Sequence, residues 1–140
     1  MKKNAAVVLL LCFVLFLVAP AGAVIVPLGA ITTNGVYVDD MNVNVDVVEV
    51  LPGHVDFTVF NQNAFDSSVA RIYFDADASV LASLAGTTAG PGTVFSQGAS
   101  PANPAGADTL DPIFVTTGDL SFGADPPPSQ NGIEPGEWFT

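Results

Sequence analysis

The sequence predicts an all-β fold: an antiparallel β-sandwich or Greek-key-like domain that follows an N-terminal signal helix and is incomplete at its C-terminal end. Short runs of alternating apolar and polar residues recur beyond residue 24, which favours half-buried strands. Gly and Pro separate these runs at short intervals, as turns between strands do. Beyond the signal no amphipathic helical pattern is present. We therefore divide the chain into a signal, residues 1–23, and a single acidic β domain, residues 24–140.

The first residues have the layout of a secretory signal peptide. Lys2 and Lys3 provide the positive start, and residues 5–19 form an uncharged apolar run. Small residues follow, and signal peptidase accepts only small side chains beside the bond that it cuts. We therefore expect cleavage between Ala23 and Val24, with signal peptidase and the export machinery as partners.

An uncleaved membrane anchor is the alternative reading of this segment. As a helix, residues 5–19 would span roughly 22 Å, which is short of the ~30 Å hydrocarbon core. Cys12 lies inside the apolar run, so a lipoprotein is not indicated. Because this single cysteine leaves with the signal, the mature domain has no disulfide.

The first part of the domain contains a clear hairpin. Residues 24–40 supply at most one ragged edge strand because Pro and Gly interrupt them. Residues 42–50 alternate as a strand, and the slip at Val47 and Val48 predicts a β-bulge. A Pro-Gly pair at 52–53 predicts a type II turn. Residues 54–60 then form the second strand of the hairpin.

A third strand is expected at residues 69–74. This strand and the hairpin strand at residues 54–60 each have one apolar face, and we expect both faces to lie in the core. This predicts a core that contains Phe57, Val59, Ile72 and Phe74.

The second part of the domain gives weaker signals. Residues 79–85 could be a strand or a helical turn, and we expect a strand. Residues 86–107 are predicted to be a surface loop around a short extended piece at 93–96. Runs at 113–116 and 120–122 suggest a second hairpin. Residues 125–128 are expected to be a polyproline-like crossover that is neither helix nor central strand.

Residues 137–140 begin what looks like a further strand. Two turn signals precede it, at 131–132 and 135–136. A strand that stops on Trp138 and Phe139 with nothing to pair it predicts that the domain is cut off there. The missing strand should leave a neighbouring strand unpaired and core side chains uncovered.

The charge of the chain excludes several classes of function. The net charge is −11, and without the signal one cation, Arg71, faces all fourteen carboxylates, which gives about −13. Such a surface cannot release counterions from nucleic acid phosphates and is repelled by anionic lipids. We therefore expect no nucleic acid partner, and membrane contact only through the signal before cleavage.

Few residues could carry chemistry. The mature chain has one histidine, no cysteine and no lysine, so we expect no enzyme and no catalytic residues. His54 reads as an exposed turn histidine, and one histidine without thiols does not predict zinc. No cofactor is expected. Two carboxylate pairs are weak calcium candidates, and solvated strand ends are the alternative reading for them. These pairs are Asp39 with Asp40, and Asp75 with Asp77.

An ordered series of short segments resembles the extracellular β domain of PEP-CTERM proteins, which exosortase sorts in Gram-negative bacteria. The segments are residues 55–61, 72–75, 95–101, 120–125 and 131–137. The resemblance implies an exported β domain followed by a Pro-Glu-Pro segment, a hydrophobic helix and a basic tail, and these last three are missing here. It implies no catalytic residues.

These observations together predict a non-enzymatic exported protein. We expect it in the periplasm, at the cell surface or outside a Gram-negative cell, as a matrix or biofilm component. The alternative is a β module that binds calcium or extracellular polysaccharide.

Overall fold

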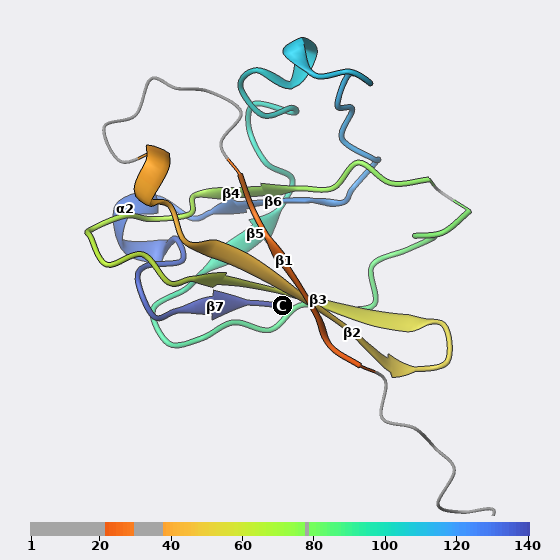
Figure 1. Cartoon of the computed structure of the whole chain (residues 1–140), viewed down its shortest axis with the longest axis horizontal. Helices are drawn as coiled ribbons and strands as arrows, with labels where there is room; N and C mark the ends of the chain where they lie inside the picture. The colour runs from red at the N-terminus through yellow and green to blue at the C-terminus, as the bar shows by residue number, and fades with distance from the viewer. Residues whose placement is uncertain (1–21, 30–37, 78) are drawn as a thin grey trace, which may run out of the picture.

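The computed structural model describes residues 22–29, 38–77 and 79–140. Most of residues 1–23, predicted as the signal, lie outside this part. Figure 1 shows the elements in chain order. They are β1 (Val24–Pro27), the 3-10 helix η1 (Val38–Asp40), β2 (Val43–Leu51), β3 (His54–Asn61), β4 (Arg71–Tyr73), β5 (Phe95–Gln97), the 3-10 helix η2 (Ala107–Thr109), β6 (Ser121–Ala124), α2 (Pro128–Asn131) and β7 (Trp138–Phe139).

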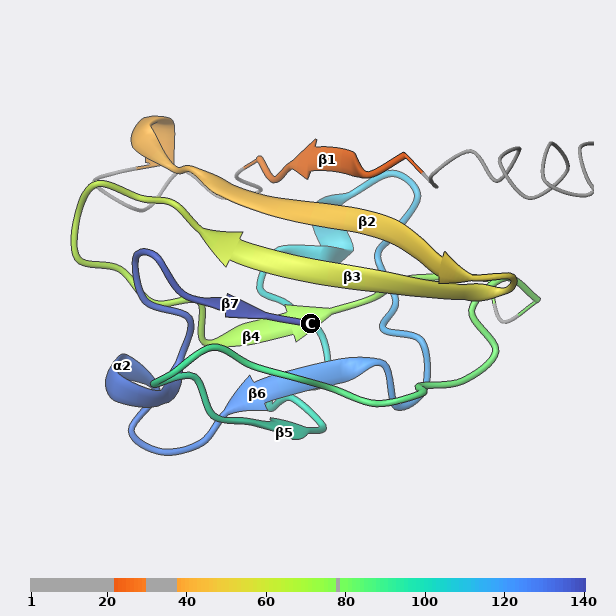
Figure 2. The same ribbon diagram turned by 90° about the horizontal axis from the view of Figure 1, so that it is seen from below.

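The strands form two antiparallel sheets, which confirms the all-β prediction. One sheet has the order β1-β2-β3-β7 and the other has the order β4-β6-β5. Seen from below, the four-stranded sheet lies above the three-stranded sheet (Figure 2). The two sheets share one core, because buried side chains from both belong to the same apolar cluster.

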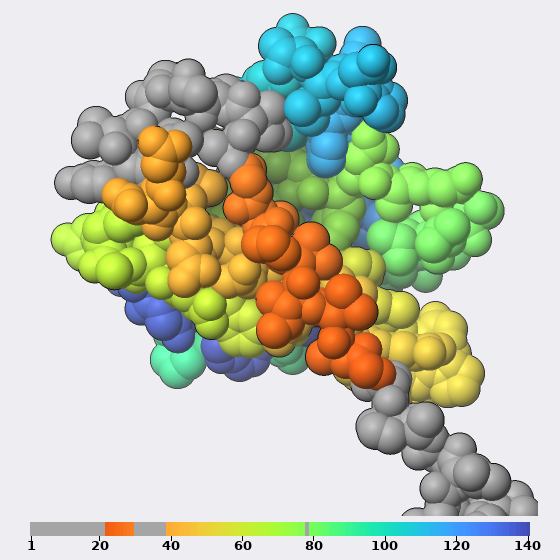
Figure 3. All heavy atoms as spheres, in the orientation of Figure 1, coloured from red at the N-terminus to blue at the C-terminus, as the bar shows by residue number. Residues whose placement is uncertain are grey.

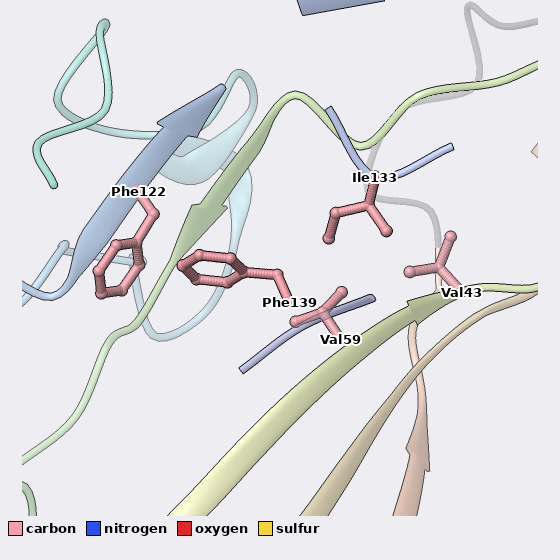
Figure 4. Close-up of a cluster of buried hydrophobic side chains, with 5 residues drawn as sticks. All are labelled: Val43, Val59, Phe122, Ile133 and Phe139. Carbon is pink, nitrogen blue, oxygen red and sulfur yellow. The ribbon is translucent and has the colours of Figure 1, made fainter. Parts of the chain in front are cut away.

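The core is built from the inward face that the alternation predicts. Val45 on β2 pairs with Val59 on β3, and Val59 pairs with Phe139 on β7, so one row of side chains crosses three strands. Figure 4 shows five side chains of this cluster converging between the sheets. These five are buried: Val43, Val59, Phe122, Ile133 and Phe139.

Aromatic contacts join the two sheets. The Phe139 ring lies 4.9 Å from the Phe95 ring and 5.3 Å from the Phe122 ring, measured between centroids. Phe57 meets Phe74 edge to face at 5.3 Å. Edge-to-face and tilted pairs at these distances are attractive beyond the area that they bury.

The four residues predicted for the core do face it. Val59 is buried, Ile72 and Phe74 pack against the buried cluster, and Phe57 is half-buried. The face assignment of the two strands is therefore right, although only Val59 is fully covered.

The first hairpin is confirmed, but its bulge is displaced. Gly53 has φ +76°, as the third position of a type II turn requires. The pairing runs without a shift through Val47 and Val48, and Val50 is the extra residue between Glu49 and Leu51. A type II turn twists against its strands, and a bulge next to the turn restores the twist. The predicted bulge at Val47 and Val48 is therefore wrong.

Residues 79–85 form no strand. The carbonyl oxygen of Asp77 accepts hydrogen bonds from the N–H groups of Val80 and Leu81, at 2.8 and 3.0 Å. These bonds close a turn, which corresponds to the helical-turn alternative. The strand prediction fails here because local hydrogen bonds satisfy the backbone.

The second predicted hairpin is half right. The turn at 118–119 exists, and β6 follows it, but residues 113–116 are not a strand. β6 pairs instead with β4 and β5, so both of its edges are occupied. The N–H of Val115 donates a hydrogen bond to the Asp75 carboxylate at 2.9 Å, so it is satisfied without a strand partner.

Residues 125–128 are not a pure polyproline crossover, because Pro128 is the first residue of helix α2. Proline is tolerated there since the first helical residues have no intrahelical acceptor for an N–H. The exclusion of a helix at this point was therefore wrong.

Within residues 137–140, Trp138 and Phe139 do form a strand, β7, and it has a partner on each side. β3 pairs with one edge. On the other edge Thr88 and Thr140 exchange two backbone hydrogen bonds of 2.8 Å. The expectation that nothing pairs this segment is wrong.

Candidate functional site

The predicted turn histidine lies where the sequence places it. His54 is exposed at the start of β3, and its Nδ1 donates to the carbonyl oxygen of Pro52 at 3.4 Å. This contact links the ring to its own turn. The only described hydrogen bond of the imidazole is therefore local to the hairpin.

The carboxylates of the second Asp pair cap nearby backbone. Asp75 Oδ2 accepts from the N–H of Val115 at 2.9 Å, and Asp77 Oδ1 accepts from the N–H of Ser79 at 2.8 Å. The backbone hydrogen bond from Ser79, together with one from its side chain, lowers the pKa of the Asp77 carboxyl. Both carboxylates are exposed. Each therefore stabilises a loop at the end of the three-stranded sheet.

The other Asp pair lies in a separate element. Asp39 and Asp40 are exposed in the short helix η1 that precedes β2. Within the described ranges, no three His, Cys, Asp or Glu side chains gather closely enough to hold a metal ion. Calcium ligation by Asp39, Asp40, Asp75 or Asp77 thus stays a prediction, which calorimetric titration with calcium tests.

An apolar groove of about 340 Å³ opens between the ends of the two sheets. Phe57 and Phe74 line it, together with Leu81 and Leu84 of the segment after Asp77. Apolar side chains at the edge of the core line the groove, so an apolar group would fit there. His54 lines the groove at its hairpin end.

The structure also shows a buried polar residue directly after the predicted strand at residues 54–60. The Asn61 side chain is fully buried, and its Nδ2 donates to the carbonyl oxygen of Ile133 at 2.8 Å. Its Oδ1 accepts from the N–H of Asn63 at 3.1 Å. Asn61 thereby fastens the end of β3 to the loop before β7. Strand alternation places residue 61 on the same inward face as Val59, and this pattern could have predicted that Asn61 is buried.

The expected cleavage site lies at the start of the first strand. Ala23 is exposed, and Val24, the next residue, begins β1. Among the residues that the structure describes, none of the helices has the length and apolar character needed to cross a membrane. No protein-family model, curated protein or solved structure matches the chain.

Proposed function

We propose that the chain is a non-enzymatic exported protein, an extracellular matrix or cell-surface component of a Gram-negative bacterium. The observation that carries the proposal is the order of its parts: a three-part secretory signal followed by a cysteine-free, acidic, all-β domain. The resemblance to PEP-CTERM proteins supports the same reading.

The use of the polar side chains supports a structural role. Asp75 and Asp77 cap loop backbone, and Asn61 ties the end of β3 to the loop before β7. These groups hold the domain in shape. Such hydrogen bonds, together with the acidic surface, suit a scaffold that stays folded and soluble outside the cell without disulfides.

Cell fractionation and N-terminal sequencing test the proposal. The full-length gene is expressed in a Gram-negative host, and the protein is recovered from cytoplasm, membrane, periplasm and medium. We expect the processed chain in the periplasm, at the cell surface or in the medium, beginning at Val24.

Replacing Ala23 with Phe is the matched variant, because a bulky side chain next to the cut bond blocks signal peptidase. This variant should stay unprocessed and membrane-bound. A chain that retains Met1 and remains in the cytoplasm would contradict the proposal.

A further inference from the structure

The outward face of the four-stranded sheet carries two neighbouring aromatic side chains. Val59 and Phe139 point into the core, so strand alternation turns Phe60 and Trp138 outward. These two residues lie directly opposite each other on β3 and β7, and both are partly exposed. Figure 3 shows the molecule from the side of this sheet, with β1 and β2 in front. We call the following residues the outer-face platform: Phe60, Trp138, Asn44, Gln62 and Thr58.

The Trp138 ring lies across a glycine. The N–H of Gly90 donates to the carbonyl oxygen of Trp138 at 2.9 Å, which places Gly90 beside β7. A Cβ added to Gly90 would lie 3.1 Å from Nε1, 3.2 Å from Cδ1 and 3.5 Å from Cε2 of the ring. Three ring atoms at nearly the same distance mean that the indole lies over the glycine backbone. The absence of a side chain at residue 90 therefore lets the ring lie against the sheet.

Amide groups border the aromatic pair. Asn44 is the cross-strand partner of Phe60. Its Nδ2 donates to Gln62 Oε1 at 2.9 Å and to Asn42 Oδ1 at 2.8 Å, and these bonds lie at the surface. They fix the amides in place, where each amide offers both donor and acceptor capacity.

Hydroxyl groups border the pair on the other side. Thr58 Oγ1 and Thr140 Oγ1 share a hydrogen bond of 2.8 Å, which places both on the same outward face. Asp46, the partner of Thr58 on β2, adds a carboxylate acceptor to this row. The platform, with Thr140 and Asp46 beside it, thus combines two aromatic rings with amides, hydroxyls and one carboxylate.

This combination fits a sugar polymer. The C–H face of a pyranose ring is apolar and packs on an aromatic ring, while its hydroxyl groups both donate and accept hydrogen bonds. The charge of the domain selects the polymer further. With about −13 charges and Arg71 as the sole cation beyond the signal, an anionic polymer would be repelled. The net charge thus excludes an anionic polymer, and the rings, amides and hydroxyls of the platform fit an uncharged one.

We propose that the outer-face platform binds a neutral polysaccharide, with sugar rings stacked on Phe60 and Trp138. This polysaccharide is a partner for the extracellular role proposed above. The inference rests on that role only for the place where protein and polysaccharide would meet, which is outside the cytoplasm. Binding itself depends on the platform.

Fluorescence tests the proposal, because Trp138 is the only tryptophan of the chain. The purified chain is titrated with neutral polymers, namely dextran, laminarin and hydroxyethylcellulose, and with anionic alginate. We expect at least one neutral polymer to shift the Trp138 emission to shorter wavelengths and to shield it from acrylamide, and alginate to do neither. No change with any of the three neutral polymers would overturn the proposal, as would an equal response to alginate.

Variants test whether the fluorescence change arises at the platform. F60A keeps the tryptophan readout and should weaken binding at least tenfold. G90A places a methyl group against the Trp138 ring, which has to move, and should weaken binding to a similar extent. G86A is the matched control, because no atom lies within 4 Å of the added methyl group, and it should bind as the unchanged chain does.

Urea unfolding of each variant verifies that the fold is kept. If G90A fails to fold, F60A still decides the question, because Phe60 lies on the outward face. Unaltered affinity in folded F60A would overturn the proposal. Failure of this inference and failure of the proposed function are separable: a chain that stays in the cytoplasm yet binds the polymer contradicts the export role alone, and an exported chain without a fluorescence response contradicts the inference alone.

Discussion

Single residues differ in how much they hold the two sheets together, and Phe139 is the clearest case. Its ring touches Phe95 and Phe122 of the facing sheet, and the side chain is only 5% exposed. Phe139→Ala should therefore cost about 3–5 kcal/mol of unfolding free energy, much of a small domain's stability. Urea unfolding measures it.

Phe57→Ala is the comparison for this prediction. Phe57 is half-buried and has one aromatic partner, so its loss should be about 2 kcal/mol, below the value for a buried ring. Equal losses for the two variants would mean that the edge of the core is packed as tightly as its centre.

Asp77 provides a second prediction at this scale. Hydrogen bonds from the backbone and then the side chain of Ser79 hold the pKa of its carboxyl below the ordinary 3.8. Because the folded pKa is the lower one, the capping interaction is complete above pH 3.8 and is lost as the pH falls through the folded pKa. Carbon-13 NMR titration of the Asp77 carboxyl should therefore show a midpoint below 3.8.

Ser79→Ala is the control for the Asp77 titration. It removes the hydroxyl and keeps the backbone N–H, so the pKa of Asp77 should rise only part of the way to 3.8. A midpoint at or above 3.8 in the unchanged chain would contradict the hydrogen bonds to Ser79.

Among the elements, the β2–β3 hairpin depends on one backbone conformation. Gly53 has φ +76°, which a side chain makes unfavourable by about 1–2 kcal/mol. Gly53→Ala should destabilise the domain by this amount, and Gly53→Asn by less, because Asn tolerates this region. Thermal unfolding measures both. Gly86→Ala, at a position without positive φ or close neighbours, should leave the melting temperature unchanged. A similar melting temperature for Gly53→Ala would show that the turn adopts another geometry.

The elements that could be predicted are those with local causes. The hairpin follows from alternation on both sides of Pro52 and Gly53, and these signals lie within one short stretch. The partners of β6 could not be predicted, because β4 and β5 reach it from distant parts of the sequence. Strand pairing of this kind depends on packing between sheets, which periodicity does not encode.

The candidate sites follow the same division. His54 could be placed in its turn because the turn is local. The Trp138 ring could not be placed on Gly90, since the two meet only through the pairing of β7 with a loop. The predicted strand ends at residue 60, one residue before Asn61, because a polar residue after an apolar run usually begins a loop.

At the scale of the whole molecule, charge controls association. About thirteen excess negative charges on residues 24–140 keep copies apart near neutral pH. Lowering the pH towards the sequence pI of about 4.1 protonates the carboxylates and removes the repulsion. Light scattering should then show association as the pH falls from 7 to 4. A particle size that stays constant across pH 4 would contradict this view of the surface.

The position of β7 has a consequence for the order in which the fold can form. Thr58 and Thr140 touch across β3 and β7, yet 82 residues separate them in sequence. Closing so long a loop carries a large entropic cost, and folds dominated by such contacts assemble slowly. During synthesis the four-stranded sheet lacks its last strand, and the core lacks Phe139, until nearly the whole domain has been made. If the chain is exported as proposed above, these late contacts favour an open chain at the translocation machinery, which can be threaded through a narrow channel and can complete its core on the far side.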